Sequence, residues 1–158
     1  MEPGGNRVLG GNSITADEWR QIVDSAIDTA IITTDLDGQV TSWSEGARHI
    51  LGWTAEEMVG RTLEHLFPDG LGATALRGEM ADARERGRGG GEEGWRVRKD
   101  GQRIWATGEM TPIRSPAQEI VGFTKVLRDR SRQREAEAAT QEERRALEIL
   151  NRAGSALA

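Results

Sequence analysis

The most informative absence in this chain of 158 residues is cysteine, of which it has none. Without a thiol the chain can form no disulfide, no cysteine nucleophile and no thiolate metal site. Apolar runs are also short, and none approaches the roughly 18 residues that a membrane-spanning helix needs. The glycine-rich start lacks the apolar core of a signal peptide. We therefore expect no membrane span and a cytoplasmic location.

Patterns of known catalytic sites are also missing. The chain has no phosphate-binding loop ending in Lys and Ser or Thr, no nucleophile elbow and no metal motif with two histidines. The glycine run at residues 87–94, GRGGGEEG, lacks the strand and helix context of a dinucleotide site, and we interpret it as a flexible connection. These absences predict a module that is not an enzyme, with no catalytic and no metal-binding residues.

Charged residues make up 30% of the chain and hydrophobic residues 36%, and the formal net charge is −5. A net negative chain argues against a general nucleic-acid surface. Much of the charge lies in the C-terminal tail, so the central part is closer to an ordinary globular domain. The length suggests one domain with extensions.

The most structured pattern is residues 94–131, GWRVRKDGQRIWATGEMTPIRSPAQEIVGFTKVLRDRS. Two turn signals, KDGQ and SPAQ, divide it into three β-prone runs. Asp100-Gly101 is a strong hairpin signal, and Pro116 fixes φ and lacks a donor, which suits a loop. The stretch therefore predicts a three-stranded antiparallel meander that leads directly into a charged helical pattern after Asp129.

The N-terminal part predicts a helix, a hairpin and several further helices. Thr15 and Glu18 have the spacing of a capping box. Apolar residues then recur at helical spacing at Trp19, Ile22, Val23, Ala26 and Ile27. Strands are predicted at residues 30–34 and 39–43, short helices ending near Gly52, Gly60 and Pro68, with a helical piece at 62–67, and a longer helix within 69–88.

In this order the motifs resemble the PAS fold. AIITTDLDGQVTSWSEGARHILGWTAEEMVGRTLEHLFP is similar to its N-terminal half, and RKDGQRIW, TPIRS and EIVGFTKVLRDRS to its C-terminal half. The resemblance covers residues 19–131 and is closest to PAS modules of bacterial sensor histidine kinases. It implies an α+β fold with a five-stranded antiparallel sheet in the order 2-1-5-4-3 and short helices on one face. The implied organisation is a flexible tail (1–14), an N-terminal helix (15–29), a PAS domain (30–131) and a C-terminal coiled-coil helix (132–158).

Alternation along the strands assigns candidate cavity residues. One face of the strand after KDGQ carries Ile104, Ala106, Gly108 and Met110, and its small members leave room for a ligand or for a bulky side chain. The resemblance places Phe123, Lys125 and Leu127 of the last strand on the same inner face. Lys125 either extends its ammonium to the cavity mouth or meets an anionic ligand.

The resemblance also raises the question of a cofactor, which we leave as none or unknown. The cysteine adduct of flavin-binding blue-light relatives is excluded. A haem needs an axial ligand, which oxygen-sensing relatives place on the long crossing helix, where this chain has no histidine. Other relatives place it on the preceding short helix, so His65 is a haem-ligand candidate, although a solvated position is favoured. A flavin stacked on tryptophan stays open, although Trp43 and Trp53 match apolar anchor positions.

Two features predict how a signal leaves the domain. In the family, an aspartate followed two residues later by Thr or Ser links the last strand to the output helix, and Asp129 and Ser131 match. The usual apolar residue between them is Arg130 here; a simple helix N-cap at Asp129 or Ser131 is the alternative.

The tail then carries a weak coiled-coil seam, with apolar members Ala146, Leu150, Ala153 and Leu157 after Ala136 and Ala139. It predicts a homodimer, with contributions from Trp19, Ile22 and Val23; the alternative is a helix that folds back on its own sheet.

These patterns predict a sensory PAS module of a two-component system. It would couple a cytoplasmic stimulus or a small-molecule ligand to a downstream output domain, expected to be a histidine kinase, through a C-terminal coiled coil. TQEERRALEILNRAGSALA resembles a connector into a GAF domain, so we expect a longer parent chain. One alternative is a ligand-free dimerisation or protein-interaction module. Another is a haem- or flavin-bearing redox or gas sensor.

Overall fold

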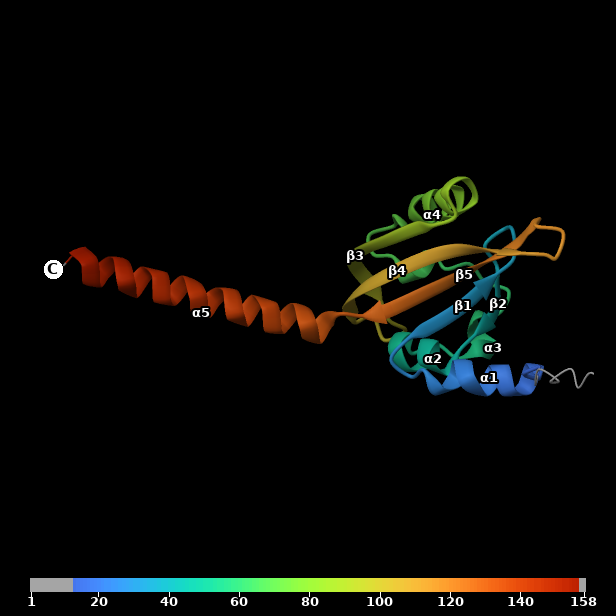
Figure 1. The fold of residues 1–158 in the computed structure, drawn as a ribbon, viewed down its shortest axis with the longest axis horizontal. Helices are drawn as coiled ribbons and strands as arrows, with labels where there is room; N and C mark the ends of the chain where they lie inside the picture. Colours follow the sequence, from blue (N-terminus) through green and yellow to red (C-terminus); the bar gives the residue numbers. More distant parts are fainter. Residues whose placement is uncertain (1–12, 157–158) are drawn as a thin grey trace, which may run out of the picture.

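The computed structural model describes residues 13–156 and shows an antiparallel sheet with helices packed on it and one long helix leaving it (Figure 1). The five strands are β1 (Ala30–Thr34), β2 (Val40–Trp43), β3 (Gly89–Val97), β4 (Arg103–Arg114) and β5 (Ile120–Asp129). Their order is β2-β1-β5-β4-β3, and every pairing is antiparallel. The fold inferred from the sequence is confirmed. Most of the predicted flexible tail, and Leu157, lie outside the described residues.

The helices are α1 (Ala16–Ser25), α2 (Glu45–Leu51), α3 (Ala55–Met58), the 3-10 turn η1 (Glu64–Leu66), α4 (Gly72–Arg86) and α5 (Ser131–Ala156). Side-chain caps explain several of their starts. Thr15 and Thr54 each form a capping box, with Glu18 and Glu57 respectively, and Ser44 accepts from the amide of Ala47. Within residues 13–156, no helix is both long enough and apolar enough to cross a membrane.

The two predicted hairpins form where the turn chemistry places them. Gly101 adopts φ 82°, which favours glycine, and the Asp100 carboxylate accepts a hydrogen bond from the Gln102 amide at 2.9 Å. In the second turn the amide of Gln118 donates to the carbonyl of Ser115 at 2.8 Å. These turns set the β3–β4 and β4–β5 registers, in which Trp95 faces Trp105 and Gly108 faces Leu127.

The interpretation of residues 87–94 as a flexible connection is wrong. β3 already begins at Gly89, which pairs with Met110. A Cβ atom at Gly89 would lie 1.9 Å from the carbonyl oxygen of Glu79, so glycine is required where α4 crosses the strand. A register shift between Gly90 and Glu93 marks a bulge. The glycines therefore permit close helix–strand packing.

The hydrophobic core lies between the inner face of the sheet and the helices α2, α3, η1 and α4. Its most fully buried large side chains are Ile32, Val40, Leu51, Met58, Leu63, Met110, Phe123 and Leu127. Figure 1 shows α1 beside α2 and α4 beside β3, whereas α5 extends away from the sheet. Among residues 13–156 the helices thus cover the inner face, while α5 contacts the sheet through its first turn and then extends away from it.

Candidate functional site

The predicted cavity residues all lie on the inner face of the sheet. Buried together there are Ile104, Ala106, Gly108 and Met110 of β4 and Phe123, Lys125 and Leu127 of β5. The room beside the small residues is taken by the chain itself. A Cβ atom at Gly108 would lie 2.9 Å from Cε of Lys125 and 3.6 Å from Nη2 of Arg96. The small stripe therefore accommodates two cationic side chains.

Lys125 forms a buried ion pair with Glu79 of α4. The side chains of the two residues are 3% and 11% exposed, and Nζ of Lys125 donates to Oε2 of Glu79. Burial lowers the pKa of Lys125, Glu79 opposes this, and the neighbouring charge of Arg96 adds to the lowering. The pair joins the central strand β5 to the helix that crosses the sheet.

Arg96 is a site residue that the sequence patterns did not reveal. It is only 7% exposed, and its guanidinium lies over the ring of Phe67, with the central carbon 4.5 Å from the ring centre. Nη1 donates to the carbonyl of Trp95 at 3.0 Å, while the buried Nε has no partner among the described residues. Burial lowers the pKa of Arg96.

The alternation in WRVR did not indicate that Arg96 is a site residue, because the large apolar Trp95 faces outward and the charged Arg96 faces inward. The signal that could have found it is the β4 alternation. The register pairs Arg96 with Ile104, an inward residue, so both share the inner face.

The predicted junction residues Asp129 and Ser131 link α5 to the middle of the sheet. The Ser131 hydroxyl accepts from the amide of Trp105 at 2.9 Å, and the Asp129 carboxylate accepts from the amide of Ser131 at 2.9 Å. Arg130, which lies between them, donates its amide to the Trp105 carbonyl at 2.6 Å, and its Nε lies 3.5 Å from Oε1 of Glu93. Three successive residues thus hold the start of α5 against β4 and β3.

Two tryptophans on the outer face extend this contact. Trp95 and Trp105 pack edge to face with ring centres 5.0 Å apart. The guanidinium carbon of Arg134 lies 3.9 Å from the Trp105 ring centre and 4.7 Å from that of Trp95. The first turn of α5 is therefore fixed by a cation–π contact as well as by hydrogen bonds.

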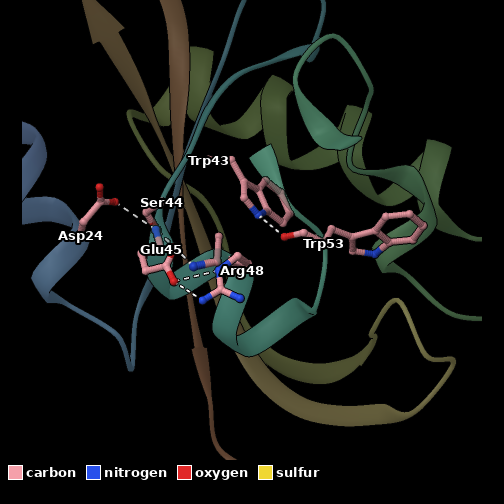
Figure 2. Close-up of polar contacts among 7 residues, drawn as sticks. Asp24, Trp43, Ser44, Glu45, Arg48 and Trp53 are labelled. Carbon is pink, nitrogen blue, oxygen red and sulfur yellow. Dashed lines mark hydrogen bonds and ion pairs between the residues drawn. The ribbon is translucent and has the colours of Figure 1, made fainter. Parts of the chain in front are cut away.

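A second connection, between α1 and α2, is shown in Figure 2. Asp24 at the end of α1 accepts a hydrogen bond from the amide of Glu45 at 3.0 Å, at the N-terminus of α2. Elsewhere in the same view the indole of Trp43 donates to the carbonyl of Trp53 at 2.8 Å. The end of α1 is thus held, while Trp19 and Ile22, predicted dimer residues, remain 59% and 50% exposed and Val23 is half-buried.

His65, the haem-ligand candidate, lies in η1 and is exposed. Its imidazole packs edge-on against Trp53 with ring centres 5.1 Å apart. Partial burial lowers the pKa of His65, and the charge of Arg61 lowers it further. Among residues 13–156 no group of three acidic or histidine side chains is arranged to hold a metal ion.

The predicted seam residues Ala146, Leu150 and Ala153 lie on α5 and are exposed, and Leu157 lies outside the described residues. Two further apolar residues accompany them, because Leu147 is 56% and Ile149 67% exposed. This end of α5 therefore presents an apolar surface that no described part of the chain covers.

The described residues form an α+β domain, with a five-stranded antiparallel sheet, helices on its inner face and a last strand that continues into a long exposed helix. The family model described as the PAS fold matches residues 17–130. The chain belongs to the PAS family.

Three relatives give this membership context. Two-component system protein A of Emericella nidulans is 36% identical over 125 residues, which are 76% of this chain but 17% of that protein. The PAS domain of a Colwellia psychrerythraea protein has a TM-score of 0.66 at 22% identity, covering 73% of this chain and 97% of the other. The structure of an RNA-binding Light-Oxygen-Voltage receptor has a TM-score of 0.64 at 16% identity. The match covers 90% of this chain and 40% of the receptor chain. The two structures support the fold alone; the chain spans 17% of the length of its curated relative.

Proposed function

We propose that this PAS module couples a cytoplasmic stimulus or a small ligand to a downstream output domain of a two-component protein, expected to be a histidine kinase, through α5. The observation that carries the proposal is the set of hydrogen bonds between Trp105 of β4 and the start of α5. Relationship to a two-component protein supports the assignment of the system.

A physical route for the signal runs along β4. This strand carries Ala106 and Gly108 on the inner face and, next to them, Trp105, whose backbone bonds Ser131 and Arg130. Gly108 and Trp105 are three residues apart, a span of roughly 10 Å along a strand. A shift of β4 at the inner face therefore displaces the atoms to which α5 is bonded.

The proposed output state is a parallel homodimer. An isolated helix with few apolar residues is marginally stable in water, so α5 gains from a partner. Leu147, Ile149 and Leu150 supply the exposed apolar surface near its end, and Trp19 and Ile22 of α1 supply a second. Pairing through both would place two sheets side by side and direct both α5 helices toward the following domains.

Spin labelling tests this proposal. Because the chain has no cysteine, Arg152→Cys introduces a unique label near the end of α5. Parallel pairing predicts a short inter-spin distance that Leu150→Asp removes and that the neighbouring off-seam change Asn151→Asp, its charge-matched control, leaves in place. If the chain labelled at Arg152→Cys, with no other substitution, shows no dipolar coupling at high concentration, the homodimer is contradicted.

A second candidate function, a ligand-free interaction module, is favoured by one observation: Lys125 and Arg96 fill the room beside Gly108. It predicts that no small molecule alters the α5 pairing. The third, a haem or flavin sensor, predicts visible absorbance in the purified protein. The exposed position of His65, packed on Trp53, favours the ligand-sensing module and the interaction module over a haem sensor.

A further inference from the structure

The inner face of the sheet contains an unbalanced group of charges. Lys125 and Arg96 are 2% and 7% exposed, and both approach the space beside Gly108. The carboxylate that opposes them is Glu79, which is bonded to Lys125. Two buried cations therefore face one buried anion.

Arg96 is the cation with unused capacity. A guanidinium offers five N–H donors in a planar fork suited to a carboxylate. Here one donor contacts the Trp95 carbonyl, the Phe67 ring covers one face, and the buried Nε bonds nothing in the described part of the chain. A buried donor without a partner costs free energy, so an incoming oxygen atom would be stabilised there.

A groove reaches Arg96 and Glu79 of this group from outside. It lies between α4 and β3, has a volume of about 400 Å³, and has Glu79 and Arg96 among its lining residues. Its walls include Thr74 and Gly78 of α4 and Gly90 of β3, so small residues keep the approach open. This volume is within the range of pockets that hold small molecules.

The rim of the groove limits what can enter. Its lining also includes Asp82 of α4 and the exposed Glu92 and Glu93 of β3. Carboxylates at the entrance repel a molecule with several negative charges but affect a singly charged one less, since Coulomb energy scales with the product of the charges. The charge pattern, with cations inside and anions at the rim, thus selects a small ligand with a single anionic group.

We propose that this PAS module binds a small organic acid through one carboxylate, which enters between α4 and β3 and pairs with Arg96 and Lys125 in competition with Glu79. The proposal rests on the ligand-sensing function proposed above and names its ligand class. Binding would draw Lys125 away from Glu79 and so loosen the connection between β5 and α4. That is a change at the strand preceding α5.

The test is titration of the wild-type chain with acetate against chloride at equal ionic strength, followed by the amide signals of Arg96 and Gly108 in NMR spectra. Saturable shifts with acetate are expected. Glu79→Gln removes the competing carboxylate while keeping the side-chain size, so acetate should bind about tenfold more tightly or better. Arg96→Met should abolish binding. Glu85→Gln, an exposed carboxylate on α4 that does not line the groove, is the matched control for Glu79→Gln and should leave acetate binding within about twofold.

Citrate tests the rim, since it should bind more weakly than acetate to the wild-type chain and gain affinity in Asp82→Asn. The proposal is overturned if acetate gives no saturable shift in the wild-type chain and in Glu79→Gln, or if a folded Arg96→Met variant binds acetate as well as the wild type. Tighter binding of citrate than acetate would overturn the single-charge selection. A chain that pairs through α5 but ignores acetate would remove only this inference, because the pairing is measured separately.

Discussion

Gly108 shows at the scale of one residue how closely the inner face is packed. A Cβ atom there would lie 2.9 Å from Cε of Lys125 and 3.0 Å from its Nζ. Lys125 can retreat only by weakening its bond to Glu79. Gly108→Ala should therefore lower the free energy of unfolding by about 1–3 kcal/mol in urea denaturation.

A matched glycine lies on the helix opposite. A Cβ atom at Gly78 of α4 would meet no other atom within 4 Å, so Gly78→Ala should stabilise the chain by up to about 1 kcal/mol. In a Lys125→Met background the cost of Gly108→Ala should shrink, because the ion pair no longer fixes the side chain. If Gly108→Ala and Gly78→Ala change the free energy of unfolding equally, Lys125 moves freely and does not restrict the space at Gly108.

His65 gives a pH-dependent prediction. Partial burial and the charge of Arg61 lower its pKa below 6.5, against smaller opposing effects of a hydrogen bond with the Thr62 backbone and of the charge of Glu64. Between the folded value and 6.5 the unfolded chain binds more protons, so stability should rise with pH through this window. Thermal unfolding between about pH 5 and about pH 7.5 should show this rise, and His65→Gln should reduce it.

At the scale of elements, turn chemistry and capping were readable from the sequence. The hairpins at Asp100-Gly101 and Ser115–Gln118 and the capping box of Thr15 depend on neighbouring residues only. The start of β3 could not be predicted from the sequence, because its glycines are explained by close contact with the carbonyl of Glu79, a residue distant in sequence. Arg96 could not be predicted as a site residue for the same reason: Phe67 and Glu79, which surround its charge, are distant in sequence.

The junction of α5 can be loosened by one substitution. Arg134→Ala removes the guanidinium from the Trp95 and Trp105 rings, contacts of a type worth about 0.5–2 kcal/mol each. Amide hydrogen exchange in the first turns of α5 should become several-fold faster, by roughly 2- to 30-fold for that range. Arg144→Ala, on the exposed part of the helix, is the control and should leave those amides unchanged. Equal exchange in both variants would mean that the hydrogen bonds of Ser131 and Arg130 hold the junction alone.

At the scale of the whole molecule, the sequence indicated which segment leaves the domain but not what it contacts. Apolar spacing predicted a long helix after Asp129, and the structure has it over Ser131–Ala156. Its seam is short of apolar residues, so a folded-back helix and a paired helix were both compatible with the pattern. The choice depends on the surface offered by the sheet and by a second chain, which local periodicity does not describe.

Homodimerisation makes the stability of the whole molecule depend on concentration. Binding between two folded chains stabilises both by mass action, so the midpoint of thermal unfolding should rise with protein concentration. Leu150→Asp should remove this dependence, and Asn151→Asp should preserve it. A hundredfold change in protein concentration shifts a coupled equilibrium by roughly 2.7 kcal/mol. A midpoint of the unsubstituted chain that stays constant over that range would contradict the dimer.

The straight exit of α5 acts as a mechanical lever. Its 26 residues span roughly 39 Å at the usual rise of an α-helix. A tilt of about 10° at Ser131 would carry the far end sideways by about 7 Å, more than the 5.4 Å pitch of one helical turn. A displacement near Trp105 too small to disturb the sheet would thus be multiplied at Ala156 into a movement as large as a one-turn change in the pairing of two helices.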